Sequence, residues 1–123
     1  MSYRFAFFKT EQEEKDSNGK KLCILWQDED WTQGLQFLTN DDQFLQLGTW
    51  WYNKGKILDR HHHNIVERKS NLTQECVVVI SGKMKVDIYD DLQKFVESFE
   101  INAGELALFE AGGHGYEILS DDT

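Results

Sequence analysis

The sequence has little cysteine, few basic side chains and no long apolar run. Its two cysteines, Cys23 and Cys76, are too few for a disulfide framework and lack CxxC spacing, so we interpret both as free thiols. The 13 lysine and arginine residues are outnumbered by 22 aspartate and glutamate residues, and the resulting net charge of −9 repels nucleic acid and anionic lipid surfaces. No apolar run approaches the roughly 20 residues that a membrane span needs.

No internal repeat, low-complexity tract or Gly/Ser linker divides the 123 residues. We therefore expect a single domain over residues 1–123, with N-terminal strands over 1–50 and the site motifs described below over 51–123. The N-terminal stretch has a short apolar patch but neither a basic leader nor a small-residue cleavage site, so it is not expected to be a signal peptide. A cytoplasmic protein is the simplest expectation.

Alternation of apolar and polar residues with a period of two indicates strands. Residues 83–90, KMKVDIYD, and residues 95–101, FVESFEI, both follow this pattern of a half-buried strand. The uninterrupted apolar run at 76–80, CVVVI, is typical of a strand covered on both faces. Further strands are expected over residues 21–27, 35–39, 43–52, 106–109 and 115–119.

The charged residues 10–21 are expected to form an exposed turn between two strands, or a short helix that ends at Asn18-Gly19. No long amphipathic helix is evident anywhere else. Short strands at this spacing predict an all-β fold, either a sandwich or a small barrel.

Three of the four histidines stand side by side, at His61, His62 and His63. Residues two apart on a strand point the same way, so His61 and His63 share a face and His62 lies on the other. Two imidazoles on one face can bind one metal ion, but a site with only two protein ligands would be weak.

Two more side chains are candidates to complete such a site. Glu75 begins the apolar run and has Val77 and Val79 on its own side, where an unpaired carboxylate is costly. His114 lies between glycines, which allow the backbone to approach closely. Three imidazoles and one carboxylate would suit a divalent transition metal, namely iron, manganese, nickel or zinc, with open positions for water or substrate.

These residues resemble the two motifs of the cupin family. The first motif, G-x5-H-x-H-x(3,4)-E-x6-G, is similar to Gly55-x5-His61-x-His63 followed by Glu75-x6-Gly82. The second motif, G-x5-P-x-G-x2-H-x3-N, is similar to the segment from Gly104 to His114. The resemblance covers about the second half of the chain and implies a cupin-type jelly-roll barrel, with His61, His63, Glu75 and His114 as metal ligands.

The chain departs from those motifs at three places. The gap between His63 and Glu75 is longer than usual, and Glu67 stands at the usual spacing instead. We favour Glu75 over Glu67 as the ligand because Glu75 has the right distance to Gly82 and enters a strand. Glu110 replaces the proline of the second motif, one residue fewer precedes the histidine, and Ile118 replaces the final asparagine.

The resemblance implies a small-molecule pocket but no single activity, since cupins include isomerases, epimerases, oxygenases and binding proteins. We expect a metal-dependent enzyme that acts on a small polar molecule such as a sugar or nucleotide-sugar, with His61, His63 and His114 as candidates for proton transfer. One alternative is a metal-free enzyme similar to WxcM-like nucleotide-sugar ketoisomerases, in which the paired histidines act as base. Another is a non-catalytic cupin that binds a metal or ligand.

Simpler roles exist for the same residues. The three adjacent histidines could belong to a polar loop, His114 could be structural, and Glu75 could accept hydrogen bonds from the backbone or from Arg60. Trp50, Trp51, Phe109 and Tyr116 are expected first as core or rim aromatics. Because cupins commonly dimerise, we also expect a homodimer in which the apolar N-terminal residues 2–9 extend or complete a sheet.

Overall fold

The computed structural model describes residues 4–7 and 20–123, and it confirms the all-β prediction. Nine strands and one short 3₁₀ helix are described, in the order β1 (Arg4–Phe7), β2 (Lys21–Trp26), η1 (Asp28–Asp30), β3 (Gly34–Phe37), β4 (Gly48–Trp51), β5 (Glu75–Val78), β6 (Lys83–Tyr89), β7 (Phe95–Asn102), β8 (Leu106–Phe109) and β9 (Gly113–Ile118). The turn expected over residues 10–21 lies mostly outside the described residues.

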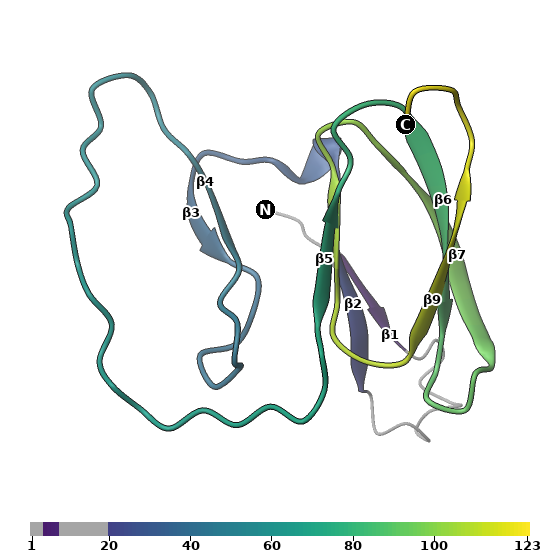
Figure 1. The fold of residues 1–123 in the computed structure, drawn as a ribbon. Helices are drawn as coiled ribbons and strands as arrows, with labels where there is room; N and C mark the ends of the chain where they lie inside the picture. Colours follow the sequence, from purple (N-terminus) through teal and green to yellow (C-terminus); the bar gives the residue numbers. More distant parts are fainter. Residues whose placement is uncertain (1–3, 8–19) are drawn as a thin grey trace.

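The strands form two stacked antiparallel sheets and a separate hairpin (Figure 1). One sheet has the order β1-β2-β8-β5 and the other has the order β7-β6-β9. The β3–β4 hairpin stands beside the first sheet, on the side away from the second one (Figure 1). Neither sheet closes into a barrel within the described residues, so the described architecture is an open sandwich with an added hairpin.

The main core lies between the two sheets and follows the predicted alternation. On β6 the side chains of Met84, Val86 and Ile88 are buried, while the residues between them are partly exposed. The buried side chains of Cys23 and Leu25 on β2 belong to the same apolar cluster. Burial of one full apolar side chain stabilises the fold by about 1.5–3 kcal/mol. Each strand therefore turns its apolar face toward the other sheet, because the opposite orientation would lose this stabilisation at several positions.

A second, smaller apolar cluster holds the hairpin against the outer face of the first sheet. It consists of Ile24 and Trp26 from β2, Leu108 from β8, and Leu38, which directly follows β3. Residues of β2 therefore alternate between the two clusters, and this strand is covered on both faces.

The apolar run at 76–80 differs from the expectation that both of its faces are covered. Val77 packs against the main core and Val79 is buried in it, but Cys76, Val78 and Ile80 point outward and are exposed. The reason is position, because β5 is an edge strand of its sheet and the hairpin covers β2 and β8 instead.

The strand expected over residues 43–52 is shorter than predicted and begins only at Gly48. A turn occupies its first part, where the backbone N–H of Gln43 donates to the carbonyl of Asn40 at 3.1 Å. The Gln43 side-chain oxygen in turn accepts from the backbone N–H of Asn40 at 2.6 Å. These local hydrogen bonds compete with strand pairing, so the strand begins later in the sequence than predicted.

Residues 52–74 form a long exposed arc between β4 and β5 that contains neither helix nor strand (Figure 1). The arc runs outside the β3–β4 hairpin, away from the two stacked sheets. Among the described residues, no helix has the length and apolar character to cross a membrane.

Candidate functional site

Glu75 is the first residue of β5, an edge strand of the first sheet. It pairs in register with Phe109 of β8, and the apolar side chains of Val77 and Val79 lie further along the same face. The Glu75 side chain is 53% exposed. The strand alternation predicted from the sequence therefore directs this carboxylate to the edge of the core, where water and solutes can reach it.

His114 comes from β9 in the other sheet and meets Glu75 there. A glycine makes its approach possible, since Gly112 has φ +72° and a Cβ at that position would lie 2.3 Å from the carbonyl oxygen of Tyr89. The His114 ring stacks on Phe109 with a centroid distance of 4.0 Å and an interplanar angle of 13°. Its side chain is only 23% exposed, so the stacking fixes a largely covered imidazole.

The Glu75 carboxylate joins His114 and Tyr116 through one oxygen. Tyr116 donates its hydroxyl to Glu75 Oε1 at 2.8 Å, and His114 Nε2 lies 3.3 Å from the same atom. The other ring nitrogen, Nδ1, is buried without a hydrogen-bond partner among the described residues. Nε2 is therefore the ring nitrogen through which His114 contacts Glu75 and can exchange a proton with a substrate.

Glu75 and Tyr116 hold each other in defined protonation states. The hydrogen bond from Tyr116 is the largest cause that lowers the pKa of the Glu75 carboxyl; partial desolvation opposes it, and the contact with His114 adds to it. Burial first, and then the bond to Glu75, raise the pKa of the Tyr116 hydroxyl. At neutral pH the cluster thus combines an ionised carboxylate with a protonated phenol.

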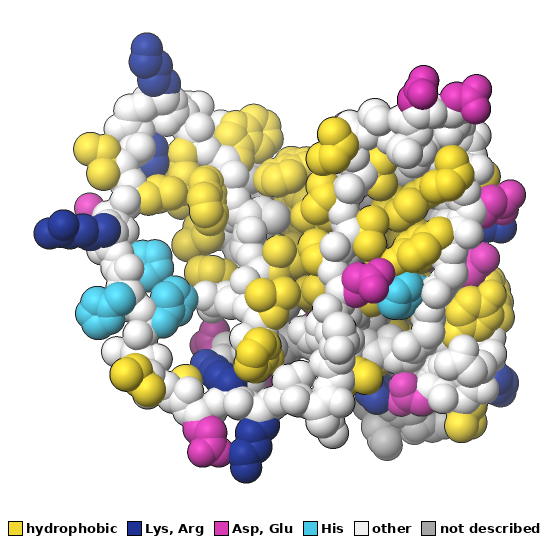
Figure 2. Space-filling model, viewed as in Figure 1, with side chains coloured by type: hydrophobic (Ala, Val, Ile, Leu, Met, Phe, Trp, Pro, Cys, Tyr) yellow, Lys and Arg dark blue, Asp and Glu magenta, His cyan; other side chains and the backbone are white. Residues whose placement is uncertain are grey.

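His61 and His63 lie on the exposed arc, far from β9 (Figure 1). The prediction that they share a face assumed a strand, and residues 61–63 do not form one, although the two rings are 5.2 Å apart between centroids. Figure 2 shows the three adjacent histidines on the side of the hairpin and the fourth beside an acidic side chain on the sandwich. The four predicted ligands are thus arranged as two separate pairs.

As arranged, the residues do not fit a metal centre. In the part of the chain that the structure describes, no group of three or more histidine, cysteine, aspartate or glutamate side chains is placed to hold a metal ion. Each pair would supply two protein ligands, which is too few for a tight site. The four-residue ligand set stays a prediction.

The other candidates also have defined places. Glu67 lies on the arc, where its highly exposed carboxylate is 3.4 Å from Lys69 Nζ, as expected of a loop residue. His62 is exposed on the same arc. Cys23 is buried and Cys76 is exposed, and both are free thiols as predicted.

The sequence interpretation missed Tyr116 as a functional residue and treated it as a core or rim aromatic. A signal for it existed, because Tyr116 follows His114 by two residues on the same strand and must share its face. Glu75 lies opposite Phe109 because of the register between β5 and β8, and no local sequence pattern specifies that register.

A scan against protein-family models, a search of curated proteins and a search of solved structures each found no match for this chain.

Proposed function

We propose that this chain is an enzyme that acts on a small polar molecule, such as a sugar or a nucleotide-sugar, by proton transfer at Glu75, His114 and Tyr116. The observation that carries the proposal is the contact between Glu75 and His114, two groups 39 residues apart on different sheets that meet at 3.3 Å. Acid–base chemistry needs an ionised acceptor and a protonated donor within reach of one substrate, and the cluster supplies both.

The roles follow from the hydrogen bonds of the cluster. Both contacts of the Glu75 carboxylate with described residues use Oε1, so a substrate can approach Oε2 as the base. The His114 imidazole is clamped on Phe109 and can pass a proton through Nε2. A carbon-bound or hydroxyl proton next to a carbonyl would move to the carboxylate, while His114, whose contact with Glu75 is the longer one, donates a hydrogen bond to the carbonyl oxygen and Tyr116 continues to orient the carboxylate.

Deuterium exchange tests the proposal directly. The full chain would be incubated in D₂O with a panel of keto and aldehyde sugars, their phosphates and nucleotide-sugars, and deuterium uptake next to the carbonyl would be followed by NMR. We expect one class of compound to exchange, and Glu75→Gln and His114→Asn to slow the exchange by about a hundredfold or more. His62→Ala is the control and should exchange normally. If Glu75→Gln exchanges at the wild-type rate, the carboxylate is not the base.

A metal-dependent form of the function is the second candidate, and the proximity of the His61 and His63 rings favours it. It requires the arc to bring these rings to Glu75 and His114, which would then hold a divalent iron, manganese, nickel or zinc ion. Such an ion would polarise a substrate carbonyl when bound.

Elemental analysis of protein purified without metal-affinity resin distinguishes the two candidates. If the four residues form one site, His61→Ala and His63→Ala each abolish stoichiometric metal, and His62→Ala retains it. Glu75→Gln should likewise weaken metal binding because the charge that neutralises the cation is lost, while Glu67→Gln should not. Equal losses in all three histidine variants would contradict the shared-face geometry, and a greater loss with Glu67→Gln would identify the other acid as the ligand.

A further inference from the structure

A pocket of about 830 Å³ on the hairpin side of the molecule gathers three of the four tryptophans of the chain. Trp31, Trp50 and Trp51 line it, and they are 36%, 57% and 47% exposed. Tyr52 adds a fourth ring. Exposed tryptophan surface is costly in water, and a flat ligand that stacks on these rings would cover it.

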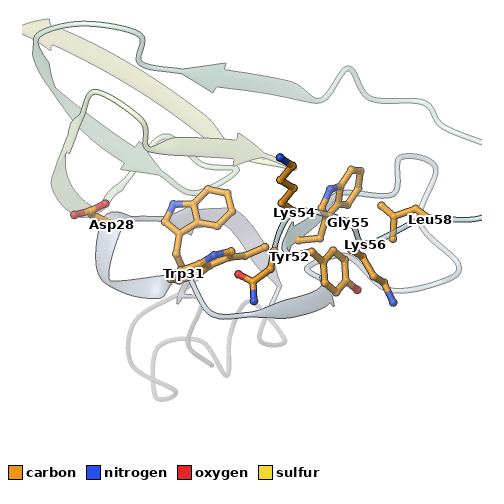
Figure 3. A pocket seen from close by; sticks show the side chains of 10 residues that line it. Asp28, Trp31, Tyr52, Lys54, Gly55, Lys56 and Leu58 are labelled. Atoms are coloured by element: carbon orange, nitrogen blue, oxygen red, sulfur yellow. The ribbon is translucent and has the colours of Figure 1, made fainter.

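The acidic and basic side chains of this pocket lie in different parts of it. Asp28 lies at one end, Lys56 and Leu58 lie toward the other, and the Trp31 and Tyr52 rings lie between them (Figure 3). Lys54 lies between the two ends, and its side chain points away from that of Lys56 (Figure 3). A ligand that spans the pocket from Asp28 to Lys56 therefore meets a carboxylate first, then aromatic faces, and then an ammonium group.

The two lysines of this pocket carry unpaired charges in a chain whose net charge is −9. Five other lysines form ion pairs with carboxylates, namely Lys20, Lys21, Lys69, Lys83 and Lys85. Within residues 20–123, neither Lys54 nor Lys56 has such a partner; Lys56 Nζ instead lies over the Tyr52 ring, 5.0 Å from its centroid. Arg60 follows closely along the arc, so this short stretch is locally basic.

We propose that this pocket binds a nucleotide, with the base stacked on the tryptophans and the phosphates at Lys56, while Lys54 adds positive charge to the middle of the pocket. Aromatic side chains stack on any base because every base has a π-face. Ammonium groups bind phosphate oxygens through charge-assisted hydrogen bonds. The Asp28 carboxylate, at the opposite end, accepts hydrogen bonds from N–H groups on the edge of the base.

The order of these groups favours a nucleotide over its parts. A free sugar offers no anion to the lysines, and inorganic phosphate offers no ring to the tryptophans. A nucleotide presents base, ribose and phosphate in sequence, which matches the sequence of aromatic and cationic side chains from Trp31 to Lys56. This binding does not depend on proton transfer at Glu75, which does not line the pocket.

Titration of the full chain by calorimetry and by tryptophan fluorescence tests the proposal. The probes are ADP and UDP, with adenosine, uridine, inorganic phosphate and glucose for comparison. We expect one diphosphate to bind with 1:1 stoichiometry and to quench fluorescence, its nucleoside to bind at least tenfold more weakly, and added salt to weaken only the diphosphate. Equal affinity for nucleoside and diphosphate, tighter binding of glucose, or no nucleotide binding would each overturn the proposal.

Two pocket variants locate the bound nucleotide, and two further variants serve as controls. Trp50→Ala removes a stacking face, and the double variant Lys54→Gln/Lys56→Gln removes both charges; each should raise the Kd about tenfold or more. Lys94→Gln changes the charge of a distant turn and serves as the matched control, with unchanged Kd. Glu75→Gln should also bind normally, so a failure of nucleotide binding and a failure of the proposed catalysis are distinguishable. An unchanged Kd in both pocket variants would show that the nucleotide binds elsewhere.

Discussion

At the scale of single residues, Tyr116 has the largest influence on the state of Glu75. Its hydroxyl hydrogen bond, at 2.8 Å, is the principal cause that lowers the pKa of this carboxyl. A group whose pKa is lowered in the folded state stabilises the fold above its unfolded pKa, and this contribution is lost as the pH falls through the folded pKa. Tyr116 thus keeps Glu75 ionised and links the cluster to acid stability.

We expect Tyr116→Phe to raise the pKa of Glu75 toward its ordinary value, because the phenyl ring keeps the shape of the side chain but cannot donate. The measurement is an NMR titration of the Glu75 side-chain carboxyl carbon. The acid limb of the unfolding curve should then lose the part of its pH dependence that comes from Glu75. Tyr89→Phe is the control, since Tyr89 contacts the Phe95 ring and leaves the cluster intact. An unchanged Glu75 pKa in Tyr116→Phe would assign the lowering to His114 instead.

Sequence patterns predict the parts of this site that a single strand determines. The positions of Glu75, Val77 and Val79 on one face follow from alternation along β5 and the residue after it, whereas His61 and His63 lie in a segment without strand structure, where alternation does not apply. Whether two strands meet depends on long-range pairing, which local patterns do not encode. For this reason Glu75 and His114 could be identified as candidates from the sequence. Their contact, and the position of residues 52–74 away from them, could not be predicted.

At the scale of elements, Glu105 links two turns that are far apart in the sequence. Its buried side chain lies directly before β8. Oε1 accepts from the backbone N–H of Asn102 at 2.6 Å, and Oε2 accepts from the backbone N–H of Asp28 at 2.9 Å. One carboxylate thereby fixes both the β7–β8 turn and the start of the 3₁₀ helix next to the tryptophan pocket.

Glu105→Ala should lower the free energy of unfolding by about 3 kcal/mol, because partly buried N–H groups lose a charged acceptor. Urea unfolding measures the change. Glu105→Gln should cost less, since it retains one acceptor oxygen. The control is Glu117→Ala, which removes an exposed carboxylate paired with Lys85 at 3.0 Å and should cost about 0–1 kcal/mol. Equal costs for Glu105→Ala and Glu117→Ala would contradict the linking role.

The accuracy of strand prediction differs between elements for a physical reason. The predicted bounds of β6 and β7 agree with the structure to within a residue, and β6 buries every second side chain as a period of two requires. At the start of β7 a register shift against the end of β6 breaks the alternation, so Phe95 is exposed and Val96 packs against the core. Residues 43–47 were misassigned as strand because side-chain hydrogen bonds to the backbone stabilise a turn there. The run at 76–80 has the composition of a central strand, yet it lies at an edge, since composition does not determine neighbours.

At the scale of the whole molecule, the first sheet ends in two strands without further partners among the described residues. β1 pairs with β2 of its own chain and forms one edge, and β5 forms the other. An edge strand presents unpaired N–H and C=O groups, which favour pairing with another chain. β1 thus extends the sheet of its own chain, and its free side forms a new edge.

We expect this edge to form a homodimer in which the β1 strands of two copies pair across a two-fold axis. Such an interface is self-complementary, because each strand meets an identical one, and it would join two four-stranded sheets into one. Light scattering on the full chain should give the mass of a dimer, and a variant that lacks residues 1–9 should give that of a monomer. Circular dichroism and urea unfolding would show that the shortened chain still folds, so that a monomer reflects a lost interface. The β1 interface would be contradicted if the full chain were monomeric. It would also be contradicted if the shortened chain folded and remained dimeric, and the exposed edge of β5 would then be the next candidate for the interface.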